Sequence, residues 1–262
     1  MTRGWDFPPD DFLEDIEGRT EAAEDLARHD NYQRAATYIE PARRSIDGAV
    51  QLPLTDIPNA TYLEHTASQV YAVAGNVQRQ LAGEAYLDPS RDPEIIAMHL
   101  NEAERLLRLA TEAGKRALLH TTAGFTHASL KTRTRTERAY AGVDLKIARL
   151  ALAKFIILRD WRAHGELRRG LNQSQQRFED WNDAVGFVSC RALVILAEQY
   201  ISPRPIFSSH MLRNITSFWK DIRSQVKNDT GHSRTAYLLA IHSIGYLALP
   251  RDILGRHLLM DF

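Results

Sequence analysis

A run of alternating basic and hydroxyl side chains offers the clearest material for binding an anion. Threonines separate the basic residues of this run, which are Lys131, Arg133, Arg135 and Arg138. On a helix, Lys131, Arg135 and Arg138 would share one face, where they could hold phosphates or an acidic peptide. The alternative is an ordinary solvated helix face or an exposed linker, which the balanced charge of the whole chain favours.

Arg159 and His164 form a second candidate pair, with four residues between them. This spacing resembles the Arg-x(4–6)-His pattern of the HEPN ribonucleases, a helical family. The resemblance implies that His164 would act on a ribose hydroxyl while Arg159 steadies the phosphate. The same loose pattern occurs at Arg204 and His210, and the candidate pair flanks an expected turn. Arg159 would then simply favour the negative end of its helix, with His164 facing a neighbour or solvent.

Other catalytic and metal-binding arrangements are absent from the sequence. The ten histidines are scattered, and no His-Glu-x-x-His motif, glycine-rich phosphate loop, dinucleotide fingerprint or Gly-x-Ser-x-Gly elbow occurs. Carboxylates gather near the amino terminus, at Asp10, Asp11, Glu14, Asp15 and Glu17. Because they belong to an expected first helical turn, helix capping explains them better than paired-acid catalysis. The sequence therefore predicts no enzyme activity, no cofactor and no metal.

Composition places the chain among ordinary globular proteins. Apolar residues make up 44% and charged residues 25% of the 262 residues, and 33 basic side chains balance 33 acidic ones. This total gives no general attraction to nucleic acid or to an anionic membrane, so such contact needs a local patch. The one cysteine, Cys190, lies in an apolar stretch and is expected to be buried and inert. No stretch resembles a membrane span or a signal peptide, which indicates a cytoplasmic protein.

Helical spacing of apolar residues recurs from end to end, whereas strand-like alternation is nearly absent. Asp92 and Pro93 mark one helix start, as N-cap and first helical residue. The spacing predicts helices over 10–28, 31–51, 59–84, 92–120, 127–158, 161–178, 184–201, 205–228, 232–248 and 251–259. We expect residues 1–9 to form an extended tail and residues 10–262 to form a single helical-hairpin domain.

Three segments share one order of features: a helix end, a polar turn, an aromatic residue and a new helix. They are residues 25–35, 155–163 and, more loosely, 176–184. The chain thus resembles the tetratricopeptide-repeat family, most clearly over 144–200, although Arg159 stands where the family's turn glycine is expected. The resemblance implies an all-α array of antiparallel hairpins, a tetratricopeptide-like α-solenoid, with a compact multi-helix bundle as the alternative. Trp161 would fill a helix crossing, so that Trp161→Ala would leave a large cavity.

A solenoid of this kind exposes polar residues of its first helices to a concave groove that holds a peptide. The candidates are Gln69, Asn76, Lys146, Arg149 and Arg191. Each could donate hydrogen bonds to a peptide backbone or carboxylate, and each could equally be ordinary surface. The leading prediction is a non-catalytic regulatory or adaptor module that binds a protein or peptide. The alternative is a HEPN-like ribonuclease or a nucleic-acid-binding factor.

The carboxy-terminal segment, 232–262, is apolar on more than one side. A terminal unit of a solenoid normally presents a polar face to water. Either its last short helix folds back as a cap, or the segment is an interface for a homodimer or another partner. The break at Pro250 favours the folded-back cap.

Overall fold

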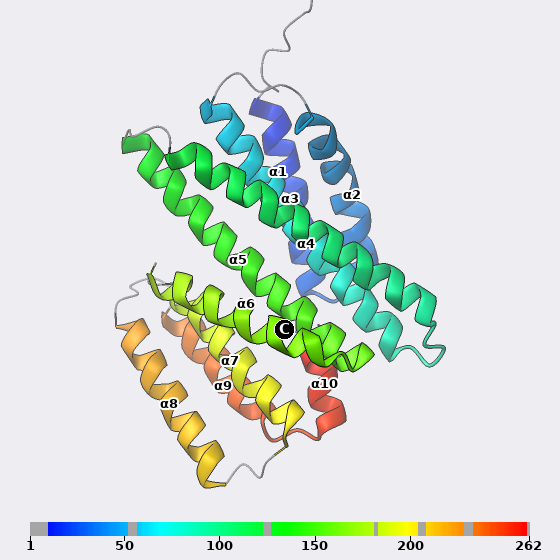
Figure 1. Ribbon diagram of the computed structural model, residues 1–262, viewed down its shortest axis with the longest axis vertical. Coiled ribbons are helices and arrows are strands. Elements are labelled where there is room, and N and C mark those ends of the chain that lie inside the picture. Colours follow the sequence, from blue (N-terminus) through cyan, green and yellow to red (C-terminus); the bar gives the residue numbers. More distant parts are fainter. Residues whose placement is uncertain are drawn as a thin grey trace, which may run out of the picture. The chain divides into compact units, whose positions relative to one another are not determined.

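The computed structural model describes residues 10–51, 57–122, 127–180, 183–203, 208–227 and 233–260, which form helices joined by turns (Figure 1). No strand occurs in this described part, so it is all-α, as the sequence predicts. The helices are α1 Asp10–Arg28, α2 Tyr32–Ala49, α3 Ile57–Leu87, α4 Pro93–Thr122, α5 His127–Leu158, α6 Trp161–Asp180, α7 Ala184–Ile201, α8 Ser209–Val226, α9 Ser233–Tyr246 and α10 Arg251–Met260. The expected tail over 1–9 lies outside the described residues.

Helix starts follow from capping side chains. The Asp92 carboxylate accepts a hydrogen bond from the backbone N–H of Glu94 at 2.9 Å, which confirms its expected role as an N-cap. Ser208 caps α8 by accepting from the N–H of Met211 at 3.3 Å, so this helix begins at Ser209 rather than near 205. The predicted limits of α1, α5 and α7 agree with the structure, and those of the other helices differ by a few residues at one or both ends.

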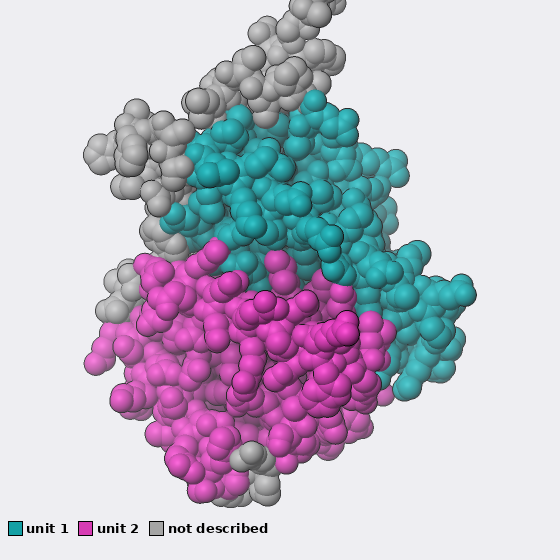
Figure 2. Space-filling model, in the orientation of Figure 1, with its two compact units in different colours: residues 1–146 teal, residues 147–262 magenta. Residues whose placement is uncertain are grey.

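The chain divides into two compact units, residues 1–146 and 147–262 (Figure 2). The segment 10–262, which the sequence predicts to be a single domain, thus contains both. The boundary falls within α5, whose residues up to Lys146 belong to unit 1 and whose residues from Ile147 belong to unit 2. Helical periodicity shows that a helix has an apolar face but not which helix covers it, so this division is not visible in the sequence.

In unit 1, α3 is the central helix and packs against α1, α2 and α4. Its completely buried apolar side chains include Leu63, Val70 and Val77. The contact between α3 and α4 is close because Gly75 has no side chain: a Cβ there would lie 2.8 Å from Cγ of Leu107. Arg116 of α4 also donates two hydrogen bonds, at 2.7 and 3.0 Å, to the Glu64 carboxylate of α3. Apolar packing and a charged pair therefore both join these helices.

In unit 2, α7 is the central helix and packs against α6, α8, α9 and α10. Cys190 is completely buried in it, as predicted. Among the described residues, α7 is the helix whose length and composition would also suit a membrane span, and 61% of it is buried within the protein. α10 folds back against α7 and buries Leu254 and Leu258, whereas Leu238 and Ile241 on α9 are half exposed. Within the described part of the segment 232–262, α9 therefore leaves apolar side chains accessible to a partner, and α10 adds Ile253, which is 39% exposed.

Arg159 takes the place of a glycine in the turn between α5 and α6. Its φ of 57° lies in the left-handed region that glycine favours. Asp30, in the turn between α1 and α2, has nearly the same φ, 58°. Each lies two positions before the aromatic residue that begins the second helix, Trp161 or Tyr32. The two turns therefore share a left-handed residue at the same position.

We expect Arg159→Gly to be more stable than Arg159→Ala by about 0.5–1 kcal/mol in urea denaturation. The left-handed conformation costs a residue with a side chain roughly 1–2 kcal/mol, and the greater freedom of glycine in the unfolded chain offsets part of this difference. Both variants lose the hydrogen bond from Arg159 to the Tyr200 hydroxyl, at 3.2 Å, so their difference isolates the backbone. Equal stabilities would show that the turn does not require this conformation.

Trp161 does not fill the helix crossing, contrary to the sequence prediction. It is 68% exposed, so Trp161→Ala would not leave a large cavity. Phe155 occupies the interior instead and is only 2% exposed. Its ring meets those of Trp161 and Tyr200 edge-on, with 5.0 and 6.4 Å between ring centroids. The buried aromatic therefore precedes the turn rather than following it.

Candidate functional site

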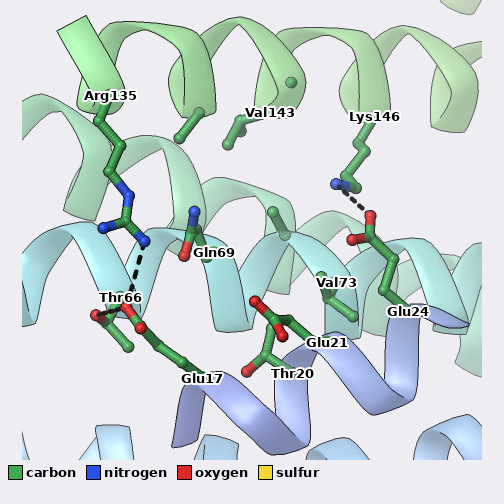
Figure 3. Close-up of a pocket in the computed structure, with 13 residues that line it drawn as sticks. Glu17, Thr20, Glu21, Glu24, Thr66, Gln69, Val73, Arg135, Val143 and Lys146 are labelled. Atoms are coloured by element: carbon green, nitrogen blue, oxygen red, sulfur yellow. Dashed lines mark hydrogen bonds and ion pairs between the residues drawn. The ribbon is translucent and has the colours of Figure 1, made fainter. Parts of the chain in front are cut away.

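A cavity of about 260 Å³ lies in unit 1, between α1, α3 and the unit 1 part of α5 (Figure 3). α1 supplies a row of carboxylates, α5 supplies two cations, and α3 supplies hydroxyl, amide and apolar groups between them. Val73 of α3 and Val143 of α5 contribute apolar surface. The cavity therefore combines charged walls with a partly apolar interior.

The α1 wall carries Glu17, Glu21 and Glu24. Their spacing of four and three residues places them on one face of the helix. A neighbouring face of α1 buries Leu13 and Ile16 in the core of unit 1. Because these apolar side chains fix the rotation of α1, the three carboxylates are presented to the cavity together.

Two cations from α5 face the ends of this row. The Arg135 guanidinium lies 3.8 Å from the Glu17 carboxylate, and the Lys146 ammonium lies 3.6 Å from that of Glu24 (Figure 3). Charge-assisted hydrogen bonds usually measure about 2.7–2.9 Å, so both ion pairs are loose. Pairs of this kind contribute little to stability and can be exchanged for contacts to a ligand at little cost.

The middle of the cavity holds two polar groups without partners. Glu21 lies between the two ion pairs, and Gln69 projects from α3 between the α1 row and α5 (Figure 3). Within the described part of the chain, neither the Glu21 carboxylate nor the Gln69 amide has a hydrogen-bonding or ionic partner. The neighbouring Thr66 hydroxyl donates to Glu17 at 3.5 Å. A carboxylate beside an amide can receive a ligand group that carries several N–H donors.

A half-buried tyrosine and a buried histidine adjoin the Arg135 end of the cavity. Burial raises the pKa of Tyr62, and the hydrogen bond from its hydroxyl to Glu17 raises it further. His65, one turn before Gln69 on α3, is 3% exposed, and neither ring nitrogen has a partner among the described residues. Burial, with a smaller contribution from the charge of Arg135, lowers the pKa of His65 to about 4. Its imidazole is therefore neutral at neutral pH.

No family model, curated protein or solved structure matches this chain. Across the described ranges, no group of three or more histidine, cysteine, aspartate and glutamate side chains is placed to hold a metal ion. The kind of ligand that the cavity can bind is therefore inferred from the charges of its lining residues. Three carboxylates face two cations, so one carboxylate is not compensated.

Three residues singled out in the sequence meet in this cavity: Gln69, Lys146 and Arg135. The sequence predicts the first two as peptide-binding residues and the third as part of the basic run. Arg138 is exposed and does not line the cavity. The side chains of Lys131 and Arg133 lie outside the described part of the structure. The basic run therefore contributes Arg135 to the site.

The other predicted groove residues lie elsewhere. Asn76 lies two turns further along α3, where its side-chain oxygen accepts a hydrogen bond from Nε of Arg79 at 3.1 Å. Arg149 and Arg191 belong to unit 2. The Arg191 guanidinium donates to the Asp221 carboxylate at 2.7 Å. The five candidates are thus divided between the two units.

The candidate ribonuclease pair, Arg159 and His164, lies in unit 2. The Arg159 guanidinium donates a hydrogen bond to the Tyr200 hydroxyl at 3.2 Å. The His164 ring lies 6.2 Å from the Phe155 ring, between centroids, and is tilted by 50°. Each side chain therefore makes a contact within unit 2 that does not involve the other.

The sequence interpretation misses the row of glutamates. It assigns Glu17 to the first turn of a helix, but α1 begins at Asp10, so Glu17 lies about two turns from the start, beyond the reach of a capping role. The regular spacing of Glu17, Glu21 and Glu24 is the signal that reveals their common face.

Proposed function

We propose that this chain is a non-catalytic binding module, a regulatory or adaptor protein of the cytoplasm, whose unit 1 cavity takes a basic side chain from a protein or peptide partner. The observation that carries this proposal is the pair of unpartnered groups, Glu21 and Gln69, between two loose ion pairs. One carboxylate in excess of the cations calls for a positively charged group. A volume of about 260 Å³ is below the roughly 300–1,000 Å³ of small-molecule sites and suits one long side chain.

We also propose tetratricopeptide-like hairpins at α1–α2 and α5–α6, with a stacked arrangement of hairpins in unit 1. Asp30 and Arg159 support the likeness between residues 25–35 and 155–163, since both turns use a left-handed residue at the same position. The packing of α1 on α2, α2 on α3 and α3 on α4, with α1 also against α3, is typical of stacked hairpins. In unit 2, the contacts of α7 with four helices favour the compact bundle. The third similar segment, 176–184, includes residues outside the described part.

The test is affinity purification from the native host with the wild-type chain and a Glu21→Arg variant, followed by nuclease treatment and identification of retained proteins. Arginine at this position places a cation where the partner's cation would bind. A hydrogen bond to a charged group contributes roughly 1.5–3 kcal/mol, so we expect partner recovery to fall at least about tenfold. Circular dichroism and thermal melting check that the variant is folded.

Glu14→Arg is the matched control. Glu14 lies on the same helix, is exposed and does not line the cavity, and its replacement changes the net charge equally. We expect Glu14→Arg to retain the partner. Equal retention by all three proteins would contradict a binding role for the cavity. Recovery of nucleic acid, with loss of the proteins on digestion, would favour the nucleic-acid alternative over a peptide partner.

A further inference from the structure

A groove of about 780 Å³ runs along α8 in unit 2. Its lining residues follow the spacing of one helix side and are Thr216, Trp219, Lys220, Arg223, Ser224 and Lys227. Another side of α8 (labelled in Figure 1) is anchored in the core by Phe218 and Ile222, which are 1% and 0% exposed. The rotation of α8 is therefore fixed, and the groove is a defined surface of unit 2.

The described lining of this groove carries three positive charges. Lys220, Arg223 and Lys227 are exposed and have no ionic or hydrogen-bonding side-chain partner among the described residues. The acidic residue of α8, Asp221, accepts a hydrogen bond from Arg191 at 2.7 Å. The neighbouring α9 carries no acidic residue. Although the charges of the whole chain balance, α8 therefore carries a local basic patch.

An aromatic side chain lies within the basic row. Trp219 is partly exposed and stacks on Tyr237 of α9, with 6.2 Å between ring centroids and 29° between ring planes. This stacking fixes the orientation of the indole ring while part of it lines the groove. Within the described residues the Ser224 hydroxyl has no partner, so it can bind a ligand oxygen.

We propose that this groove binds single-stranded nucleic acid, with backbone phosphates at Lys220, Arg223 and Lys227 and a base stacked on Trp219. From Lys220 to Lys227 the helix advances about 10 Å, so the three cations follow one another along one side of α8, where each can contact a phosphate of the same strand. Cations that follow the backbone, with an aromatic ring for the bases, are the usual means of binding single strands without sequence preference.

Other anionic ligands fit the groove less well. An anionic membrane surface would need apolar side chains to insert, but Trp219 is the sole large apolar residue of the described lining. A single phosphorylated side chain would leave part of the cationic row unused. The groove belongs to unit 2, so its occupation does not depend on what the unit 1 cavity binds.

The experiment measures fluorescence anisotropy of a short labelled oligouridylate with the full chain at several salt concentrations. For a single strand, the slope of log K against log salt concentration is about −0.7 for each neutralised phosphate, so three contacts predict a slope of roughly −2.

Arg223→Glu should weaken binding at least about tenfold, and Lys227→Glu gives a second test if the first variant does not fold. Arg213→Glu, on the same helix outside the groove, should change affinity less than about twofold. Trp219→Leu should weaken binding while retaining most of the salt slope.

Any one of three outcomes would overturn the proposal. The wild-type chain does not bind the oligonucleotide, Arg213→Glu weakens binding as much as Arg223→Glu does, or Trp219→Leu leaves the affinity unchanged. Binding to phosphatidylserine vesicles without binding to the oligonucleotide would assign the groove to a membrane surface instead.

Discussion

Phe155→Ala should lower the free energy of unfolding by about 3–5 kcal/mol. Phe155 is 2% exposed, and its ring meets those of Trp161 and Tyr200 edge-on. Truncation removes this apolar surface from the core of unit 2 and leaves a cavity that the surrounding helices fill only in part. Urea denaturation followed by circular dichroism measures the loss.

Trp161→Ala is the control, because it removes the larger aromatic from the other side of the same turn. Trp161 is 68% exposed, so its contribution is limited to the edge contact with Phe155, about 1 kcal/mol. A loss from Trp161→Ala equal to that from Phe155→Ala would mean that the wrong aromatic has been placed in the core.

The free energy of unfolding should fall by about 3 kcal/mol as the pH is lowered from 6.5 towards 4, through His65 alone. Its pKa in the folded protein, about 4, lies below the ordinary value of 6.5 that the unfolded chain restores. The unfolded state therefore binds the proton first. The full stability is present above pH 6.5 and is lost progressively down to about pH 4, below which this residue causes no further change.

The measurement is a series of urea denaturations across this pH range, on the wild-type chain and on His65→Leu. Leucine has no proton to bind and keeps the site apolar. The difference between the two proteins therefore isolates His65 from the carboxylates that also titrate in acid. Parallel pH profiles would contradict the burial of an unpartnered imidazole at this position.

The helices could be predicted from the sequence because their signals are local. Asp92 and Pro93 mark the start of α4, and apolar spacing is sufficient to define α5 and α7. The two compact units could not be predicted in this way. α3 and α7 both read as apolar helices, but the identity of the helices packed around each depends on contacts between residues far apart in the sequence.

The site could be predicted only in its parts. Gln69, Lys146 and Arg135 were each recognisable as polar residues on helices, but α3 and α5 had to be brought together before they formed one cavity. The glutamates were misassigned because local capping explains an acidic helix start so readily. The same reason applies to Trp161 and Phe155: the direction of the chain after Arg159, with its φ of 57°, decides which aromatic enters the core.

Cys190 allows the opening of unit 2 to be measured without any substitution. It is the chain's single thiol, and it is completely buried in the central helix of unit 2. A thiol reagent in excess reaches it only when α7 separates from its neighbours, so the labelling rate measures how often unit 2 opens. A ligand that binds only the closed form slows labelling by the factor 1 + [L]/Kd. The kinetics of a single alkylation can therefore report occupancy of unit 2 even before the chemical identity of its ligand is known.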